Sequence, residues 1–333
     1  MLYNQPMANQ RILSGIQPTG KLHIGNYLGA VTNWVKLQNE YDCYFAVVDM
    51  HSVTADYKPA EKREQIFSTV VDLIASGIDP EKSVLFLQSQ VPEHAELAWY
   101  FSTLTPVSFL ERMTQYKDKA ARQKANINAG LFIYPVLQAA DILLYKPYGV
   151  PVGEDQLQHL ELANDIARKF NARFTKTFEP VKPLLTRTPR VMSLLEPHKK
   201  MSKSLGPQHV INISDDVAAI EKKISRAVTD TGTTKQMSAG TKNLFTLLEN
   251  FGEPDEYHFF KESFAAGNIK YSDLKKNLSK LIAHHFAEYR RKRQELEKNQ
   301  DYVMQVMARG KEKAQAIAAR TLMEVKTKMG LVL

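Results

Sequence analysis

Short apolar runs and helical periodicity alternate along the first half of the chain. The apolar runs are typical of strands buried on both faces of a parallel sheet, and they lie at residues 11–16, 42–48, 83–87 and 149–152. Between them, apolar residues recur every three or four positions. This spacing predicts helices at 59–76, 93–103, 108–118 and 131–145, and a long helix from Glu154 to about Phe170. Strands that alternate with helices predict an α/β fold with a doubly wound parallel sheet.

The second half of the chain has a different pattern. From about residue 209 onward the apolar residues follow helical spacing only, apart from a Gly/Thr/Ser-rich stretch at 230–241 that predicts a loop. This change of pattern predicts a domain boundary between about residues 185 and 210. The sequence therefore predicts an α/β domain followed by an all-helical domain.

The positive charge is concentrated near the C-terminus. The chain of 333 residues has a formal net charge of +8, and residues 271–333 alone contain 14 Lys and Arg against 7 Asp and Glu. Taken alone, this charge favours a solvated helical face, which is the usual place of Lys-rich helices. A surface that binds nucleic acid is the alternative.

Composition excludes several classes of protein. The single cysteine, Cys43, excludes disulfide bonds and Cys-rich zinc sites, and its apolar neighbours predict a small buried residue. No apolar run reaches the roughly 18 residues that indicate a membrane-spanning helix. Residues 1–10 are polar and lack the apolar core of a signal peptide. We therefore expect a cytoplasmic protein without a membrane partner.

The loop between the first strand and the next helix is the first candidate binding segment. Residues 17–26 contain a Gly/Pro turn, and apolar residues at helical spacing begin at Ile24. A helix N-terminus presents unpaired N–H groups, which suit a phosphate. Gly25 leaves room for a flat base against the backbone, and His23 and Asn26 add donors. No Walker A or dinucleotide-binding pattern is present, so an ordinary strand-to-helix turn is the alternative.

A second candidate segment lies within the predicted domain boundary, at residues 199–207. Lys200 and Lys203 flank Met201 and Ser202, and the segment ends in a Gly-Pro pair. Such a loop can fold over the phosphates of a nucleotide and neutralise the charge that develops as pyrophosphate leaves. A short Lys/Ser run on its own is more often a solvated linker.

Together the two segments resemble the class I aminoacyl-tRNA synthetases. Pro18-x4-His23-Ile24-Gly25-Asn26 is similar to the HIGH element of that class, and residues 200–204 match its KMSKS element at every position. Asn26 stands where HIGH ends in His, a variant familiar in the tryptophan branch. The same branch is indicated by the segments at 14–18, 111–115, 139–145, 150–159 and 227–230. The resemblance runs from about residue 11 to 330.

The resemblance implies a fold and an activity. It implies a homodimer with a Rossmann-type catalytic domain (1–185), a KMSKS linker (186–208), a helical anticodon-binding domain (209–300) and a C-terminal helix that packs back toward the catalytic domain (301–333). It implies that tryptophan is activated with ATP and Mg²⁺ and then transferred to the 3′ end of tRNA(Trp). The Mg²⁺ ion would be carried on ATP, without a dedicated protein site.

Roles for individual residues follow from the same resemblance. The ATP site would comprise Gln17, Pro18, Thr19, Gly25, Asn26, Gly153, Glu154, Asp155, Val191, Lys200, Met201, Ser202, Lys203 and Ser204. The residues that act on the reacting phosphates would be Lys119, Lys200 and Lys203, with Ser202 and Asn26 beside them. Little proton transfer is needed when a carboxylate attacks a phosphorus, so positioning and charge neutralisation should dominate and we expect no general base.

The amino-acid pocket must hold an indole, whose only polar atom is an N–H donor. Asp141 is the natural acceptor because it lies in an apolar run, where an unpaired carboxylate is costly; a capping or surface carboxylate is the alternative. A competitor without the N–H would be expected to leave Asp141 unpaired. The resemblance adds apolar walls and ammonium-binding groups at Leu13, Ile142, Val150, Val152, Tyr134 and Gln156. His51 lies near this pocket, with a structural histidine as an equally weighted alternative.

Two other functions fit parts of the sequence. An adenylyltransferase of the same superfamily would explain the first segment and the basic loop, but it leaves the long helical, basic C-terminal part unexplained. A synthetase-like protein that only binds RNA would be expected to have lost the lysines of the 200–204 segment, and both are present.

Overall fold

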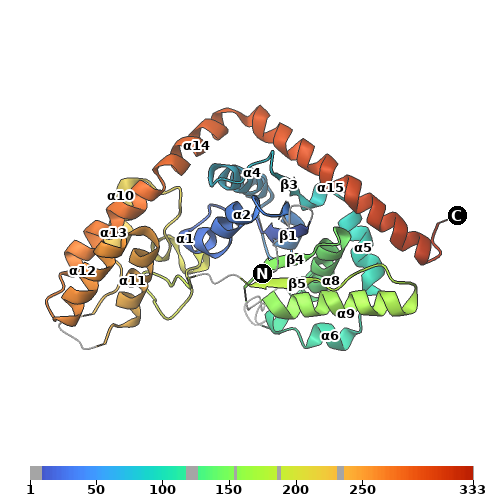
Figure 1. Ribbon diagram of the computed structural model, residues 1–333, viewed down its shortest axis with the longest axis horizontal. Helices are drawn as coiled ribbons and strands as arrows, with labels where there is room; N and C mark the ends of the chain where they lie inside the picture. The colour runs from blue at the N-terminus through green and yellow to red at the C-terminus, as the bar shows by residue number, and fades with distance from the viewer. Residues whose placement is uncertain (1–9, 118–126, 154–155, 186–188, 231–235, 333) are drawn as a thin grey trace, which may run out of the picture. The chain divides into compact units, whose positions relative to one another are not determined.

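The computed structural model of the protein describes residues 10–117, 127–153, 156–185, 189–230 and 236–332. The chain forms two compact units, and each contains more than one stretch of sequence. The first unit comprises Met1–Gly20, Trp34–Arg187 and Asn299–Leu333, and the second comprises Lys21–Asn33 and Thr188–Lys298. Figure 1 shows the helices and strands of both units, with labels on most of them.

The first unit is built on a five-stranded parallel sheet. Its strands are β1 (Arg11–Ile16), β2 (Asp42–Val47), β3 (Ser83–Leu87), β4 (Gly149–Val152) and β5 (Lys182–Leu185), in the order β3-β2-β1-β4-β5. The strand order reverses beside β1, which pairs with β2 on one side and with β4 on the other. In doubly wound sheets ligands bind at such a switch point, beyond the carboxyl ends of the strands.

The predicted α/β class and four of the strands are confirmed, but β5 is not among the predictions. This strand lies at the edge of the sheet, contains Pro183 and exposes most of its side chains. Proline and lysine are typical of edge strands because one side of the strand needs no ladder hydrogen bonds. The short apolar run that identifies the other strands is therefore missing here.

Helices surround the sheet of the first unit. The predicted helix over 108–118 is interrupted at residues 112 and 113, and the long helix predicted from Glu154 begins at Leu157 in the described chain. The helices are α2 (Thr32–Leu37), which enters the unit at Trp34, α3 (Asp49–Ser52), α4 (Pro59–Ala75), η3 (Gln88–Gln90), α5 (Glu93–Ser102), α6 (Val107–Glu111), α8 (Ala129–Leu144), α9 (Leu157–Arg173) and α15 (Gln300–Lys328).

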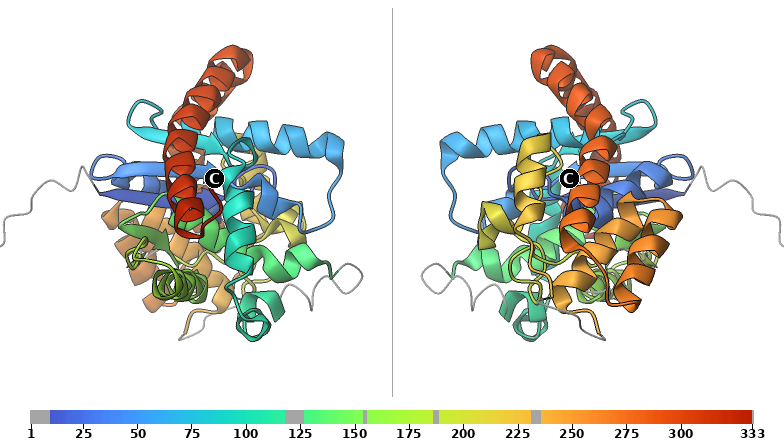
Figure 2. Two further views of the ribbon diagram at one scale, coloured as in Figure 1. Left: turned by 90° about the vertical axis from the view of Figure 1, so that its right-hand side faces the viewer. Right: turned by 90° about the vertical axis from the view of Figure 1, so that its left-hand side faces the viewer.

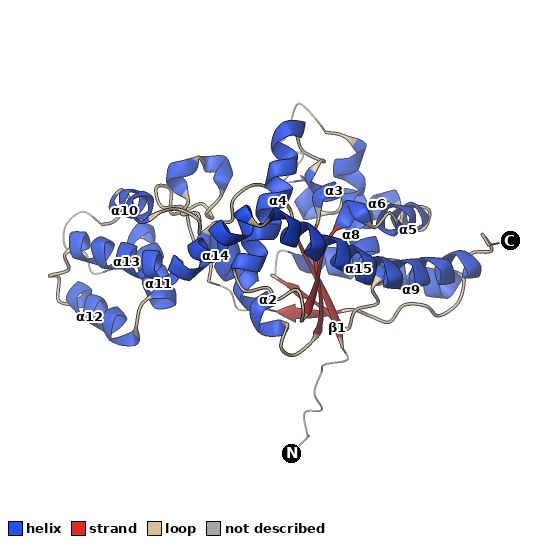
Figure 3. Ribbon diagram, turned by 90° about the horizontal axis from the view of Figure 1, so that it is seen from above, coloured by secondary structure: helices blue, strands red, loops and turns tan. Residues whose placement is uncertain are grey.

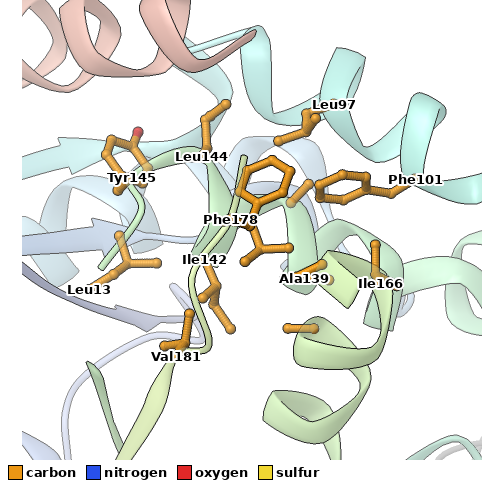
Figure 4. Packing of buried hydrophobic residues seen from close by; sticks show 14 of the residues in the cluster. Leu13, Leu97, Phe101, Ala139, Ile142, Leu144, Tyr145, Ile166, Phe178 and Val181 are labelled. Atoms are coloured by element: carbon orange, nitrogen blue, oxygen red, sulfur yellow. The ribbon is translucent and has the colours of Figure 1, made fainter. Parts of the chain in front are cut away.

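An extensive apolar core lies on one face of the sheet. Alternate side chains of β1, β2 and β3, such as Leu13 and Phe86, point to this face and pack against apolar residues of α5, α8, α9 and α15. Figure 4 shows Leu97 and Phe101 of α5 beside Ala139 of α8. On the other face of β2, Phe45 stacks on Trp34 with ring centroids 4.7 Å apart. Packing on both faces of the sheet holds the strands, and therefore their carboxyl ends, in fixed positions.

The C-terminal helix α15 covers the β3 edge of the sheet. It packs against β3 and α5, and Figures 2 and 3 show it running beside the strands. Ion pairs join α15 to the rest of the unit, between Arg309 and Glu81, between Lys326 and Glu96 and between Glu324 and Lys146. A covered edge strand cannot pair with a strand of another chain. Helix α15 therefore protects the β3 edge of the sheet.

The second unit is helical. Its short elements are α1 (Ile24–Asn26), the π-helix η2 (Tyr27–Val31) and the 3₁₀ helices η5 (Lys203–Leu205) and η6 (Pro207–His209). The longer helices are α10 (Val217–Ser225), α11 (Ala239–Phe251), α12 (Pro254–Ala265), α13 (Tyr271–His285) and α14 (Ala287–Lys298). Helix α13 is the centre of this group, because it contacts α10, α11 and α14. The helix expected to begin at Ile24 does so, but its second turn is π-helical, which hydrophobic spacing alone does not indicate.

None of the helices in the described ranges is long and apolar enough to span a membrane.

Candidate active site

A cavity of about 320 Å³ opens at the switch point of the sheet in the first unit. Its walls come from the carboxyl ends of β1 and β4, from the inner face of α8 and from the start of α9. All eight residues that the resemblance assigns to tryptophan line this one cavity: Leu13, His51, Tyr134, Asp141, Ile142, Val150, Val152 and Gln156. They come from segments more than 100 residues apart, and the fold brings them together.

The cavity combines apolar walls with a few buried polar groups. The Tyr134 hydroxyl lies 3.1 Å from Nε2 of His159, which also lines the cavity. Burial raises the pKa of Tyr134 to about 12, so its phenol is neutral at physiological pH. A pocket of this composition suits a flat apolar ligand with a small number of polar atoms.

Asp141 accepts hydrogen bonds from three side chains of the protein. Its Oδ1 atom accepts hydrogen bonds from Gln88 Nε2 at 2.7 Å and from His94 Nδ1 at 2.6 Å. Its Oδ2 atom lies 2.6 Å from His51 Nε2. His94 in turn lies 2.9 Å from the hydroxyl of Tyr145, one helical turn after Asp141. Three different elements, α3, η3 and α5, therefore supply donors to one carboxylate on α8.

The surroundings keep this carboxylate ionised. Burial on its own would raise the pKa of Asp141, but the attraction of His51 and the hydrogen bonds from His51 and His94 outweigh burial and lower that pKa below its ordinary range. The cavity therefore contains a carboxylate that is ionised at physiological pH, and such a group is a strong acceptor for an N–H donor.

One expectation about Asp141 is wrong. A competitor that lacks an indole N–H does not leave the carboxylate unpaired, because side chains of the protein already donate to both oxygens. The two alternatives for His51 are also not exclusive, since it lines the cavity and hydrogen bonds Asp141.

Sequence reasoning did not identify His94, Gln88 or Tyr145 as part of this site. Asp141 in an apolar run signals that a partner must exist, but the spacing along the chain does not say which residue it is. The partners lie 47 and 53 positions before Asp141, on elements that only the folded sheet brings close. Cavity residues such as Gln115 and His159 were likewise not singled out for this pocket.

In the second unit, the HIGH-like and KMSKS segments are held by one small antiparallel pairing. The Ile24 N–H donates to the carbonyl of Ile211, and the Ile213 N–H donates to the carbonyl of Leu22, both at 2.9 Å. His23 and Asn212 form the bridge between these two bonds. The residues that follow the KMSKS segment therefore fix the position of the HIGH-like segment.

His23 caps the helix that begins at Ile24. Its Nδ1 atom accepts a bond from the Asn26 N–H, and the Asn26 side-chain oxygen accepts one from the His23 N–H, both at 3.3 Å. Burial first, and then the positive charges of Lys203 and Lys200, lower the pKa of His23 to about 4. The ring is thus neutral at physiological pH, and because Nδ1 is an acceptor, the proton is on Nε2. His23 therefore offers one N–H donor.

The KMSKS segment places its lysines beside that donor. Met201 is buried, its N–H donates to the Val191 carbonyl at 3.1 Å, and a Cβ atom at Gly25 would lie 3.8 Å from the Met201 Cβ. Lys200 forms an antiparallel bridge with Met192. Burial lowers the pKa of Lys203 to about 8. The hydroxyls of Ser202 and Ser204 lie 2.9 Å apart.

The residues expected to bind ATP fall in both units. In the first unit Gln17 lines the cavity, while Pro18 and Thr19 form the turn after β1 and Gly153 follows β4. In the second unit, backbone and side-chain contacts bring together Gly25, Asn26, Val191, Lys200, Met201, Ser202, Lys203 and Ser204. Lys119, Glu154 and Asp155 lie outside the described residues.

The basic cluster of residues 290–293, on helix α14, is largely paired with its own helix. Arg291 forms ion pairs with Glu288 and Glu295, and Arg293 forms one with Glu297. Arg290 donates to the carbonyl of Ala283, at the end of α13. Much of the positive charge of this cluster is therefore neutralised by acidic residues of the same unit.

The fold and the site define a class I nucleotide-dependent enzyme, in which a Rossmann-type sheet is combined with HIGH-like and KMSKS segments. The sequence model of the family "tRNA synthetases class I (W and Y)" matches residues 5–287. The chain belongs to this family, and the predicted family, fold and enzyme class are confirmed.

Individual relatives share almost the whole chain. "Tryptophan–tRNA ligase 2" of Streptomyces avermitilis is 43% identical over 97% of this chain and 97% of its own length. "Tryptophan–tRNA ligase" of Caldanaerobacter subterraneus is 42% identical over 97% of this chain and 99% of its own. The structure is similar to that of the tryptophanyl-tRNA synthetase of Campylobacter jejuni complexed with ADP and tryptophan, with a TM-score of 0.85, 34% identity and coverage of 96% and 100%.

Proposed function

We propose that this protein is a tryptophan–tRNA ligase. It activates L-tryptophan with ATP, releasing pyrophosphate, and transfers the tryptophanyl group of the adenylate to the 3′ end of tRNA(Trp). The observation that carries the proposal is the single cavity that gathers all eight expected tryptophan residues around the ionised Asp141, in a chain that belongs to the W and Y family.

The chemistry of activation suits the groups of the second unit. A carboxylate oxygen of tryptophan attacks the α-phosphorus of ATP, a new O–P bond forms, and the bond to the leaving pyrophosphate breaks. Both reactants are negatively charged, so the step needs neutralisation and positioning more than proton transfer. The neutral His23 supplies an N–H donor, and Lys200 and Lys203 supply positive charge next to it. Mg²⁺ enters as the ion bound to ATP.

The roles within the cavity follow from polarity. Asp141 accepts the indole N–H, and the apolar side chains Leu13, Ile142, Val150 and Val152 enclose the ring. Tyr134 and Gln156 bind the ammonium group, and His51 lies at the indole end because it bonds Asp141. The residues assigned to the ribose and base of ATP are Gln17, Pro18, Thr19 and Gly153 in the first unit, and Gly25 and Val191 in the second. Glu154 and Asp155, assigned to the same role, lie outside the described residues.

Partner and domain roles are part of the same proposal. Residues 1–185 carry catalysis, 186–208 the KMSKS linker and 209–300 the anticodon-binding helices, and the last helix (301–333) returns to the catalytic domain. The enzyme acts as a cytoplasmic homodimer. Exposed large apolar side chains of the first unit, such as Trp99 (68% exposed) and Val107 (61%), support a subunit interface there.

Exchange of labelled pyrophosphate into ATP tests this function. Exchange that depends on L-tryptophan is the expected result. Exchange that depends on a different small metabolite would identify an adenylyltransferase, and no exchange with any substrate would identify a protein that only binds RNA. Charging of tRNA(Trp) with labelled tryptophan tests the second step separately.

A further inference from the structure

The bonds around Asp141 leave one of its acceptor positions open to the cavity. A carboxylate has about two acceptor positions on each oxygen. Gln88 and His94 both donate to Oδ1, while Oδ2 has one described partner, His51. One further N–H donor can therefore bind Oδ2, provided that the carboxylate plane stays where these bonds hold it.

His94 is built to fix that plane. It lies in the first turn of α5, is fully buried, and its ring packs against Phe86 and Tyr145. Its Nδ1 atom faces the carboxylate, which only accepts, so the ring proton is on Nδ1. Its Nε2 atom faces the hydroxyl of Tyr145, which can then donate to it. Burial raises the pKa of Tyr145, so the phenol keeps its proton.

These bonds form a chain from Tyr145 through His94 to Oδ1 of Asp141. Asp141 lies in the last turn of α8 and Tyr145, four positions later, caps that helix, and His94 of α5 bridges both. The carboxylate, which only accepts, sets the His94 tautomer, and the Tyr145 hydroxyl donates to Nε2 and so holds the ring in this orientation. The position of Asp141 is set by two helices together and not by the rotamer of its own side chain alone.

We propose that His94, held by Tyr145, is a positioning residue for the selection of tryptophan: it holds Oδ1 of Asp141 so that Oδ2 presents its open acceptor position to one N–H donor in the cavity. The proposal rests on the proposed function and deepens it. His94 also lines the cavity, but the role proposed for it and for Tyr145 is exerted through the carboxylate of Asp141.

The test compares L-tryptophan with 3-benzothienyl-alanine, in which sulfur replaces the indole N–H. The measured quantity is the ratio of kcat/KM for the two substrates in pyrophosphate exchange. The ratio is insensitive to the fraction of enzyme that is folded, because both values come from one preparation. A loss of packing between α5 and α8 would lower both values together, whereas a misplaced Asp141 lowers the value for tryptophan more.

Three variants separate positioning from packing. His94→Leu removes a bond to a charged group and should lower the ratio by roughly 10- to 100-fold. His94→Asn keeps an N–H donor near the Nδ1 position and should keep most of the wild-type ratio. Tyr145→Phe removes only the hydroxyl and should lower the ratio by roughly 3- to 10-fold, as expected for a neutral hydrogen bond.

Tyr100→Phe is the matched control, since it removes a tyrosine hydroxyl that bonds Glu96 on the same helix α5; its ratio should equal that of the wild type. Wild-type ratios in both His94→Leu and Tyr145→Phe would overturn the proposal while tryptophan-dependent exchange persisted. Absence of exchange in the wild-type enzyme would overturn the proposed function instead.

Discussion

Gly310 of α15 lies against the carbonyl oxygen of Leu85 in β3, so closely that a Cβ atom at position 310 would be 1.8 Å from that oxygen. A backbone oxygen cannot move aside as a flexible side chain can. We therefore expect Gly310→Ala to push α15 off the sheet edge and to lower the free energy of unfolding by about 2 kcal/mol. Urea unfolding measures this change.

Gly29→Ala provides the comparison for this prediction. Gly29 is also helical, but a Cβ atom there would meet nothing within 4 Å. The substitution Gly29→Ala should therefore change the free energy of unfolding by less than about 1 kcal/mol in either direction. Equal effects of the two substitutions would show that the close approach of α15 to β3 does not limit residue 310.

The basic cluster on α14 should divide into structural and solvated members. Arg290→Gln should destabilise the helical unit, because it removes a donor to the Ala283 carbonyl at the end of α13. Arg291→Gln should change stability by less than about 1 kcal/mol, because its ion pairs are exposed. Thermal unfolding of the two variants measures the difference.

The same cluster provides a test of contact with tRNA. If residues 290–293 neutralise phosphates, Arg291→Gln reduces the slope of log affinity for tRNA against log salt by about 1. Tryptophan-dependent pyrophosphate exchange should be retained. An unchanged slope would assign the charge of Arg291 to a solvated helix face.

His23 should titrate far below an ordinary histidine. Its pKa of about 4 lies below the ordinary value of 6.5, so in this range the unfolded chain binds a proton that the folded protein does not. The stability contributed by neutral His23 is therefore complete above pH 6.5 and is lost as the pH falls toward 4. His23→Asn keeps a helix-capping oxygen but removes the titrating ring, so this part of the acid destabilisation should be absent.

The lysines near His23 should influence the pKa of its ring. NMR titration of His23 should show a higher pKa in Lys203→Gln, because one of the charges that lower it is removed. Lys222→Gln, a change on α10 that is not among the causes of the shift, should leave the pKa as it is. A wild-type pKa near 6.5 would contradict the buried capping role of His23.

Lys203 should act mainly in the transition state of activation. Because its charge is needed as pyrophosphate leaves, Lys203→Ala should lower the rate of adenylate formation by roughly 100-fold or more, with little change in the equilibrium binding of tryptophan. Pre-steady-state activation and equilibrium binding measure the two effects. Lys199→Ala removes a neighbouring lysine that is paired with Glu196 and should leave activation nearly unchanged.

The pH dependence of kcat/KM for ATP provides a second test of the role of Lys203. With a pKa of about 8, this lysine loses its charge as the pH rises through 8, so kcat/KM for ATP should decline on the alkaline side. Lys203→Arg keeps the charge at high pH and should remove this decline. An identical alkaline limb in both proteins would assign the decline to another group.

The sequence predicts most of the sheet because four strands are mainly apolar, as burial on both faces requires. It does not predict β5, since an edge strand with Lys182 and Pro183 has no such run. The cavity residues follow from a resemblance to a family, residue by residue. Hydrophobic spacing alone would not bring Leu13 and Val150 to one wall, because that requires the β1–β4 pairing.

The polar partners of Asp141 show a different limit. Burial of Asp141 is predictable, because it lies in an apolar helix and an isolated carboxylate there is costly. The identity of its partners is not, because His94 and Gln88 belong to another strand–helix connection and their spacing carries no helical or strand period. A carboxylate predicted to need its substrate as a partner is instead satisfied by the protein.

This finding changes what substitution of Asp141 should do. Asp141→Ala removes the shared acceptor of Gln88, His94 and His51, and leaves buried donors without a partner. We expect a loss of about 3 kcal/mol in the free energy of unfolding, as for other buried charged pairs that lose one member. Asp141→Asn keeps one acceptor oxygen but turns an amide toward one of the donors, so it should cost less. Chemical denaturation of both variants, monitored by circular dichroism, measures these losses.

The same two substitutions of Asp141 should also change the activity and the selectivity of the enzyme. Tryptophan activation should fall in both variants, and the ratio of kcat/KM for tryptophan to that for phenylalanine should narrow, most in Asp141→Ala, because the acceptor for the indole N–H is lost. The discrimination arises from a bond that tryptophan gains at Oδ2 and phenylalanine does not, since the carboxylate is paired in either case. A wild-type ratio in Asp141→Ala would mean that the shape of the cavity selects the substrate, with Asp141 serving only to join α8 to His51, Gln88 and His94.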